Sequence, residues 1–558
     1  MKKIFYVVTL LMAVLLTACG GGNEEKTATN DSASVEKTVE QTLTFNLGAD
    51  PKSVDPQLNS ATDGGIVINN TFEGLMRTDV SGKAQPAGAE SVDVSDDKLT
   101  YTFHLRKDAK WSDGKPVTAN DYKYAWLRAL DPAVASEYSF QLYYIKGGQE
   151  YFEGKGKKED VGLKVVDDYT FEVTLKAPVA YFMDLVTFYT FMPVRQDMVE
   201  QKPEGWAKDP KLAVSNGPFK ISEYKMNDKI VLVKNENYRE AANVKLDKII
   251  MEMIVDSSTA ITAYDSNEID VLITIPTPEI PKRQVEDPTF SVQPYLGTYY
   301  YIFNVNKAPT NDINVRKALT LAIDREQIVN DVTKAGQQPA TGFVPTGLVD
   351  SQGNDFRATA GDYGISTTAD VEAAKAALNK YLKAQGYKDV SEMPAVELIY
   401  NTSEGHKAVA EAIQEMWKKN LGVKVNLVNQ EWAVFQDTRH VGNFEVARGG
   451  WIGDYNDPMT FLDLWTSYSG NNDAQWSYKK GDFPENKEFD RLIENSKVAQ
   501  GEARDKDLYT AEKILMDNLV ISPIYYYTAP VMVKDKVKGW ERDILGTWYL
   551  GNTEIVAE

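Results

Sequence analysis

A strand, a helix and a second strand follow one another between residues 396 and 428, and this succession limits the possible folds more than any other feature. The apolar segment VELIY (396–400) precedes a helical stretch from about His406 to Asn420, and Gly422 ends that stretch before VKVNLV (423–428). This is the spacing of a βαβ unit with parallel strands. The sequence therefore predicts an α/β fold with mixed sheets, in which shorter alternating strands add antiparallel pairs.

Two further helices are indicated by caps and by the spacing of apolar residues. In residues 313–335 the apolar residues recur near a period of 3.6, and Gly336 provides a stop. Thr118 and Asp121 are three residues apart and can cap a helix that carries Trp126. We expect helices to alternate with strands along most of the chain.

Length and charge limit the class of protein. With 558 residues the chain exceeds the size at which single cores stop growing, so we expect at least two lobes. The formal net charge of −20 argues against nucleic acid as a partner, because nucleic acids attract basic surfaces. We expect a soluble monomer.

The only cysteine, Cys19, follows a short apolar run that begins behind Lys2 and Lys3. A charged start, an apolar stretch and small residues before a cleavage point are typical of a secretory signal, and the run is too short for a transmembrane helix. The segment Leu16-Thr17-Ala18-Cys19 resembles the lipobox of bacterial lipoproteins. In that class the cysteine takes a diacylglycerol and becomes the new amino terminus after residues 1–18 are removed.

Residues 19–41 are small, polar and charged, which is typical of a flexible tether. The lipobox resemblance implies export, with the body held by lipid at the outer face of the cell membrane, as in Gram-positive cells. Because no cysteine follows position 19, the body must be stabilised by packing and hydrogen bonds instead of disulfides.

The sequence contains none of the common catalytic motifs. It has no phosphate loop, no HExxH and no GxSxG, and it has only three histidines. We therefore expect no catalytic residue, no metal site and no cofactor. A hydrolase that uses two carboxylates stays open as an alternative, because acidic pairs are frequent in so acidic a chain.

The body as a whole resembles the oligopeptide-binding proteins (OppA type) of bacterial ABC importers, in family 5 of the extracellular solute-binding proteins, the peptide/nickel class. The resemblance runs in order from about Gln41 to the C-terminus. It is carried by the segments FHLRKDAKWSDGKPVTANDY, VSNGPFKISEY, NEIDVL, YLGTYYY, NTSEGHKAV, VNLVNQEW and VARGGWIGDYNDP.

The resemblance implies a three-lobed Venus-flytrap fold of the periplasmic-binding-protein type (class II, cluster C) that closes about a hinge. Lobe I would comprise residues 42–72, 196–298 and 528–558, lobe II residues 73–195, and lobe III residues 299–527. The ligands would be short peptides. The partners would be the transmembrane subunits of an ABC permease with cytoplasmic ATPases.

The resemblance also implies which residues hold the two ends of a peptide. Asp454, in GGWIGDYNDP, stands where the family contacts the ligand's amino group, and a carboxylate suits that task because charge-assisted hydrogen bonds are strong. Arg448 stands where the family contacts the carboxylate of a shorter peptide. His406 and Lys307 stand where longer peptides find their carboxylate partner.

The peptide backbone and side chains would meet a further set of residues. Segment 449–454 and the region of Ser60 to Thr62 would pair with the ligand as with an added strand. Aromatic residues would line side-chain pockets. The full set is Ser60, Ala61, Thr62, Tyr144, Tyr299, Tyr300, Trp432, Gly450, Trp451, Ile452 and Tyr526.

Two alternatives remain open from the sequence. Within the same fold, the chain could serve a single signalling peptide, such as a pheromone, or a non-peptide cargo such as a nickel or haem complex. The alternative from another class is a secreted hydrolase of peptides or glycans. The first reading, capture of oligopeptides for an ABC permease by a protein that is not an enzyme, fits the largest part of the chain.

Overall fold

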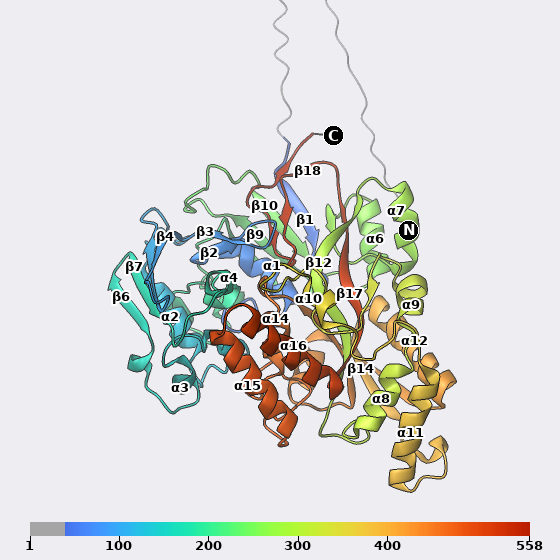
Figure 1. Ribbon diagram of the computed structural model, residues 1–558. Helices are drawn as coiled ribbons and strands as arrows, with labels where there is room; N and C mark the ends of the chain where they lie inside the picture. Colours follow the sequence, from blue (N-terminus) through green and yellow to red (C-terminus); the bar gives the residue numbers. More distant parts are fainter. Residues whose placement is uncertain (1–38, 558) are drawn as a thin grey trace, which may run out of the picture. The chain divides into compact units, whose positions relative to one another are not determined.

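The computed structural model describes residues 39–557, so Cys19 and the predicted signal peptide lie outside the described residues. Within this range eleven strands form one mixed sheet (Figure 1). In order across the sheet, the strands are β15 (Val425–Gln430), β14 (Val396–Asn401), β16 (Val446–Ile452), β12 (Phe290–Phe303), β17 (Ile521–Val533), β11 (Val271–Leu272), β1 (Thr42–Asn46), β10 (Lys248–Glu252), β9 (Lys229–Lys234) and β8 (Phe219–Lys225), with β13 (Gln338–Pro339) paired to β17 off this path.

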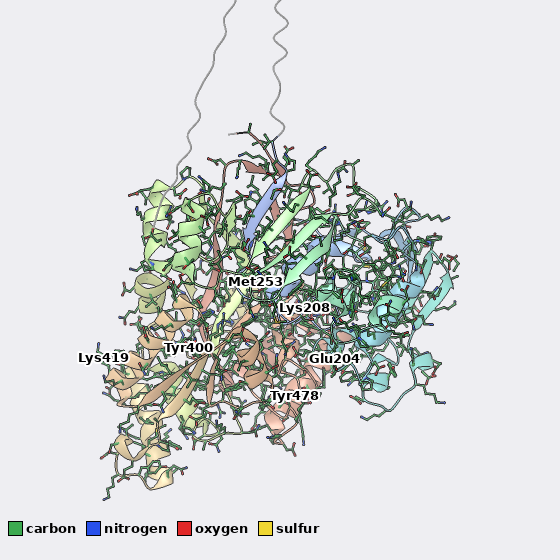
Figure 2. The ribbon with its side chains drawn as sticks, turned by 180° about the vertical axis from the view of Figure 1, so that it is seen from behind. Glu204, Lys208, Met253, Tyr400, Lys419 and Tyr478 are labelled. Carbon is green, nitrogen blue, oxygen red and sulfur yellow. The ribbon has the colours of Figure 1, made fainter. Side chains whose placement is uncertain are left out.

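The predicted βαβ unit is confirmed. Strands β14 and β15 pair in parallel from Val396 and Val425 onward, and α12 (Glu404–Leu421) connects them. The side chain of Ser403 caps the start of α12 by accepting from the backbone N–H of His406, and Gly422 follows its end with φ 76°. The apolar face of α12, with Ile413 and Trp417 fully buried, packs in one core with Val396 and Leu398 of β14. Figure 2 labels Tyr400 of β14 and Lys419 of α12.

Strands β12 and β17 are the longest of the sheet and run side by side through its middle (Figure 1). Near one end, β17 also pairs with β11, and towards the other end β12 pairs with β16. Their mutual register shifts between Pro294 and Thr298 and again after Tyr299. The predicted limits of lobes I and III, at 298/299 and 527/528, fall inside these two strands, and the positions of these limits stay a prediction.

A separate antiparallel sheet of four strands occupies part of residues 89–174, in the order β4 (Ala89–Val94), β5 (Thr100–Leu105), β7 (Thr170–Thr174) and β6 (Leu163–Asp167), all inside the described residues. Helix α2 (Ala119–Ala129) packs on it, with Trp126 fully buried and edge-on to Phe171 at 5.3 Å between ring centroids. The predicted capping box is present, because Thr118 and Asp121 bond to each other's backbone N–H groups. This sheet lies at the left in Figure 1.

The single helix predicted for residues 313–335 is wrong, because the structure divides it. Helix α8 (Ile313–Leu321) ends, and Asp324 caps a new start by accepting from the N–H of Gln327, ahead of α9 (Arg325–Gln327) and a π-helical turn at 328–333. The guanidinium of Arg325 is fully buried and donates to the carbonyl of Pro523 at 2.7 Å. The cap at Asp324 and the buried hydrogen bond of Arg325 change the direction of the chain at this point. The spacing of the apolar residues alone would continue the helix.

Candidate functional site

A cavity of about 770 Å³ lies between α1 (Thr62–Thr71), α13 (Trp432–His440), the end of β16 and residues 541–549 near the C-terminus. Most of the residues that the sequence predicts for ligand binding line this cavity. The nominated residues that line it are Ser60, Ala61, Thr62, Tyr300, Trp432, Arg448, Gly450, Trp451, Ile452 and Asp454.

Strand β16 supplies one wall of the cavity. Because side chains alternate along a strand, Arg448, Gly450 and Ile452 share one face. A side chain at Gly450 is excluded by close neighbours, since a Cβ there would come within 2.4 Å of the Tyr527 hydroxyl. The absence of a side chain at Gly450 therefore lets the Tyr527 hydroxyl lie close to the backbone at the middle of this wall.

The backbone of β16 has a free edge beside the cavity. On one side β16 pairs with β12 along its whole length, from Phe303 opposite Val446 to Gly297 opposite Ile452. On the other side it pairs with β14 only at Val446 and Ala447. From Arg448 to Ile452 no other strand of the described chain pairs with that side, so its backbone groups are open to an added strand.

Asp454 follows the end of β16 and carries a recessed carboxylate. The carboxylate accepts hydrogen bonds from the Tyr138 hydroxyl at 3.1 Å and from the Gln141 amide at 2.9 Å. Burial raises the pKa of the Asp454 carboxyl well above its ordinary range, and the nearby charge of Asp463 raises it further. No lysine or arginine among residues 39–557 lies within ion-pair distance of it, so a cationic ligand group would find a vacant counter-charge here.

Arg448 presents the opposite charge on the same wall. Its Nη2 donates to the Tyr527 hydroxyl at 2.8 Å, and its guanidinium carbon lies 4.9 Å from the centroid of the Tyr299 ring. Its Nε–H is buried without an acceptor, and no carboxylate of the described residues forms an ion pair with it. A planar cation held in this way is suited to an anionic group of a ligand.

Two nominated residues lie in a layer behind Arg448 and do not line the cavity. Tyr299 is fully buried, stacks on Tyr525 at 4.6 Å between ring centroids, and its hydroxyl lies 3.3 Å from Nδ1 of His406. Burial and the nearby charge of Arg448 lower the pKa of His406 well below its ordinary value, so the imidazole is neutral at pH 7. The predicted role of His406 for longer peptides stays a prediction.

The other three nominated residues lie away from the cavity. The Tyr144 hydroxyl is buried 2.9 Å from that of Tyr181, and the Tyr526 hydroxyl accepts from the N–H of Gly342 at 3.2 Å. Lys307 is half-buried, and its charge opposes the rise that burial causes in the pKa of Glu445. Their predicted contacts with a ligand stay predictions.

Several residues that line the cavity were not predicted from the sequence. Tyr527 was missed although it belongs to the run Tyr525 to Tyr527, in which alternation places the first and third residues on one face. Tyr138 lies just before a short 3₁₀ segment far from Asp454 in the chain, and no local pattern predicts their contact. Arg77 and Arg439 also line the cavity, and no local pattern in the sequence predicts their position there.

Helix α13 is fixed to the opposite side of the cavity by a chain of charges. Asp473 contacts Arg439 at 2.6 Å and His440 at 2.7 Å, and the other ring nitrogen of His440 lies 3.3 Å from Glu137. Lys52 then joins Glu137 at 3.6 Å to Asp437 of α13 at 2.8 Å. These paired groups connect parts of the chain that lie far apart in sequence.

Trp432 and Asp63 add a hydrogen bond between the two sides of the cavity. The indole Nε1 of Trp432 donates to the Asp63 carboxylate at 3.1 Å. Burial raises the pKa of Asp63 to about 6, while hydrogen bonds from Gly64 and Trp432 oppose that shift. The start of α1 and the start of α13 therefore lie in direct contact.

Residues 39–557 contain no group of three or more histidine, cysteine, aspartate or glutamate side chains placed to hold a metal ion. None of the helices in that range has the length and apolar character needed to cross a membrane.

Comparison with known proteins relates this cavity to a family. The model described as bacterial extracellular solute-binding proteins, family 5 Middle, matches residues 83–473. The chain is 38% identical over 547 residues to the oligopeptide-binding protein OppA of Bacillus subtilis (strain 168), with 97% of each chain covered.

Solved structures agree in fold. The crystal structure of the Haemophilus influenzae OppA complex with RPPGFSPFR has a TM-score of 0.86 at 34% identity and covers 93% of this chain and 99% of that one. An unliganded open form of the murein tripeptide binding protein MppA, also 34% identical, covers 93% and 98% but has a TM-score of only 0.61. The described chain is thus arranged more like the ligand complex than like that open form. It belongs to the bacterial extracellular solute-binding proteins of family 5 and has their three-lobed Venus-flytrap α/β fold with mixed sheets.

Proposed function

We propose that this protein captures short peptides whole, in extended form, outside the cell and delivers them to an ABC permease. One observation carries the proposal: an unpaired carboxylate, Asp454, and an unpaired guanidinium, Arg448, lie on the same wall of the cavity, with the free edge of β16 between them. A peptide carries an ammonium group, a carboxylate and a backbone of donors and acceptors between them. Each of these groups needs a partner once water is excluded.

The dimensions of the wall suit a short ligand. The four residue steps from Arg448 to Ile452 span about 13 Å of extended strand. A peptide of three to five residues spans roughly 10 to 17 Å in the same conformation. Ser60, Ala61 and Thr62, on the opposite side, would supply further backbone groups, and Trp432, Trp451 and Tyr300 would contact side chains.

Closure about the hinge would couple binding to delivery. In the assignment proposed here, lobe I (42–72, 196–298 and 528–558) and lobe III (299–527) close on the peptide, and strands β12 and β17 connect them. A ligand that contacts both lobes shifts the population toward the closed form. The permease would recognise that form. The protein would act as a monomer and would catalyse no reaction.

The anchor is a second part of the proposal. Cys19, outside the described residues, would carry a diacylglycerol, and residues 19–41 would tether the body to the outer face of the cell membrane. Two acyl chains give stable membrane attachment, whereas one gives only marginal binding. A Cys19→Ala variant should appear in the culture medium with its peptide affinity intact, and loss of peptide binding in that variant would contradict this division of labour.

Calorimetric titration of the purified, ligand-stripped protein with tri- to pentapeptides tests the proposal. We expect saturable binding with a stoichiometry of one. Failure of every peptide in a mixed library to bind would overturn the assignment.

Mass spectrometry of the protein purified from its own cells separates the alternatives within the fold. A ladder of peptide masses in the cavity would support general capture. A single defined mass would identify a dedicated signalling peptide or a non-peptide cargo instead. Formation of cleaved products during a clean incubation would indicate a hydrolase.

A further inference from the structure

The cavity extends along α1 well beyond the segment between Asp454 and Arg448. Residues at both ends of the helix line it, from Thr62 to the C-cap Phe72, and ten helical residues span about 15 Å. We call the part past the C-terminal end of α1 the side arm. Its walls include Phe72, Arg77, Met192, Tyr238, Leu545 and Tyr549.

The side arm adjoins the cavity near Asp454. Leu545 lies against Gly453, where an added Cβ would come within 3.4 Å of a Leu545 methyl group. Gly453 directly precedes Asp454 in the chain. A ligand whose amino group is bound at Asp454 would therefore direct the side chain of one of its first residues toward the arm.

Arg77 is a cation of the arm without a hydrogen-bonded partner. It lies in β2 (Met76–Thr78), is half-buried, and its guanidinium carbon lies 5.1 Å from the centroid of the Tyr549 ring. Within residues 39–557 no carboxylate lies within ion-pair distance of it. The Tyr549 ring lies against the planar guanidinium, but the N–H groups of Arg77 donate to no acceptor of the described residues.

The acidic residues around the arm are already engaged. Glu73 accepts from Arg239 at 2.8 and 2.9 Å, and its Oε1 also accepts from Tyr238. Glu240 also pairs with Arg239. Glu73 and Glu240 therefore stabilise the charged form of Arg77 only by electrostatic attraction, without direct contact.

Two further acidic residues of the cavity lining, Asp79 and Glu541, also have protein partners. Asp79 accepts from Ser81 within its own turn and from Gln85 of the following strand, and Glu541 accepts from Asn552 at 3.1 Å. A ligand carboxylate would therefore meet donors at Arg77 that no protein acceptor occupies.

We propose that Arg77 binds a carboxylate of the peptide and so gives the side arm a preference for acidic ligands. The inference rests on the function proposed above and names a substrate class for it. The apolar walls, Phe72, Met192 and Leu545, would cover the methylene groups of a glutamate side chain while the guanidinium pairs with its end. The same chemistry could come from a terminal carboxylate, and the experiment distinguishes the two sources.

The test compares matched peptides. Alanine tri- and tetrapeptides that carry Glu or Gln at each position in turn, and versions with a C-terminal amide, are titrated into the wild type and into Arg77→Gln. We expect the wild type to bind at least one Glu peptide about tenfold more tightly than its Gln partner. In Arg77→Gln that ratio should fall close to one, and in Arg77→Glu a Lys peptide should become preferred.

Controls keep the outcome specific. Arg491→Gln removes the same charge from an exposed arginine on α15 (Pro484–Val498) and should keep the wild-type ratio. Arg77→Lys keeps the charge without the planar fork, and an intermediate ratio is expected. Should Arg77→Gln fail to fold by circular dichroism, the lysine variant carries the test.

The outcomes are distinct. A loss in Arg77→Gln of the preference for free over amidated C-termini, with no effect on Glu against Gln, would assign Arg77 to a terminal carboxylate. Equal ratios in the wild type and Arg77→Gln for both comparisons would overturn the inference. If no peptide binds the wild type, the proposed function fails instead.

Discussion

Two sets of charged residues border the same cavity and differ in how they are satisfied. Asp454 and Arg448 have neutral hydrogen-bonding neighbours but no opposite charge within reach among the described residues. In contrast, a continuous series of ion pairs runs from Arg439 through Asp473, His440, Glu137 and Lys52 to Asp437. Both sets are largely removed from solvent.

The difference separates ligand binding from closure. A recessed charge without a counter-charge costs free energy, and a ligand that supplies the opposite charge recovers it. A charge that the protein itself pairs contributes instead to holding the two walls together. Unpaired charges at a cavity therefore indicate what the ligand carries, and paired charges indicate which segments must meet for the cavity to close.

The largest expected effect is on ligand affinity, from Asp454→Asn. The amide keeps the size of the side chain but removes its charge, and loss of one partner of a buried charge pair costs about 2 to 5 kcal/mol. We expect peptide affinity to fall by about 30-fold to several thousandfold in calorimetric titrations. Because burial already raises the pKa of Asp454, the ligand-free variant should melt no lower than the wild type.

Acetylated peptides provide the control for this prediction. Acetylation removes the ammonium group that Asp454 is proposed to bind, so the wild type should lose affinity for the acetylated form. Asp454→Asn should discriminate far less between free and acetylated peptides. Equal discrimination by both proteins would show that the amino group binds elsewhere.

Features that depend on local spacing could be predicted from the sequence. The βαβ unit at 396–430 and the cap at Thr118 each involve residues close in the chain, and both are present.

Contacts between distant segments were not accessible in this way. The hydrogen bond from Trp432 to Asp63 joins residues 369 positions apart, and the bond from Tyr138 to Asp454 joins residues 316 positions apart. Neither pair has a spacing that one sequence can reveal. The break in the helix predicted for 313–335 has the same cause, since Arg325 is held by a carbonyl almost two hundred residues away.

The paired set predicts a pH dependence of stability, of intermediate size. Burial lowers the pKa of His440, but Asp473 and Glu137 outweigh it and raise the pKa to about 9. A histidine whose folded pKa exceeds its unfolded value of about 6.5 stabilises the protein fully below pH 6.5 and loses this contribution as pH rises to about 9. The unfolding free energy should fall by up to about 3 kcal/mol over that window.

His440→Gln is the variant that checks this prediction. Its melting temperature should be lower than that of the wild type at pH 6, and the two should converge near pH 9. His104→Gln serves as the control, because His104 is more exposed and pairs with an exposed Asp93. A decline with pH that persists unchanged in His440→Gln would place the titrating group elsewhere.

The smallest expected effect comes from the hydrogen bond between Trp432 and Asp63, which joins the two walls. Trp432→Phe removes the indole N–H and leaves the buried Asp63 carboxylate without that donor, at a cost of about 1 kcal/mol. We expect a fivefold to tenfold loss of peptide affinity, which corresponds to roughly that free energy. Val434→Ala, at an exposed position of the same helix, should bind as the wild type does.

A double variant separates a contact with Asp63 from a contact with the ligand, since Trp432 also lines the cavity. If the indole acts through Asp63, the loss caused by Trp432→Phe should be much smaller in an Asp63→Asn background, because the amide carries no buried charge to be left unpaired. Additive losses would instead mean that the ring contacts the peptide directly. In that case the connection of α13 to the opposite wall would depend on the ion pairs of Lys52, Glu137 and His440.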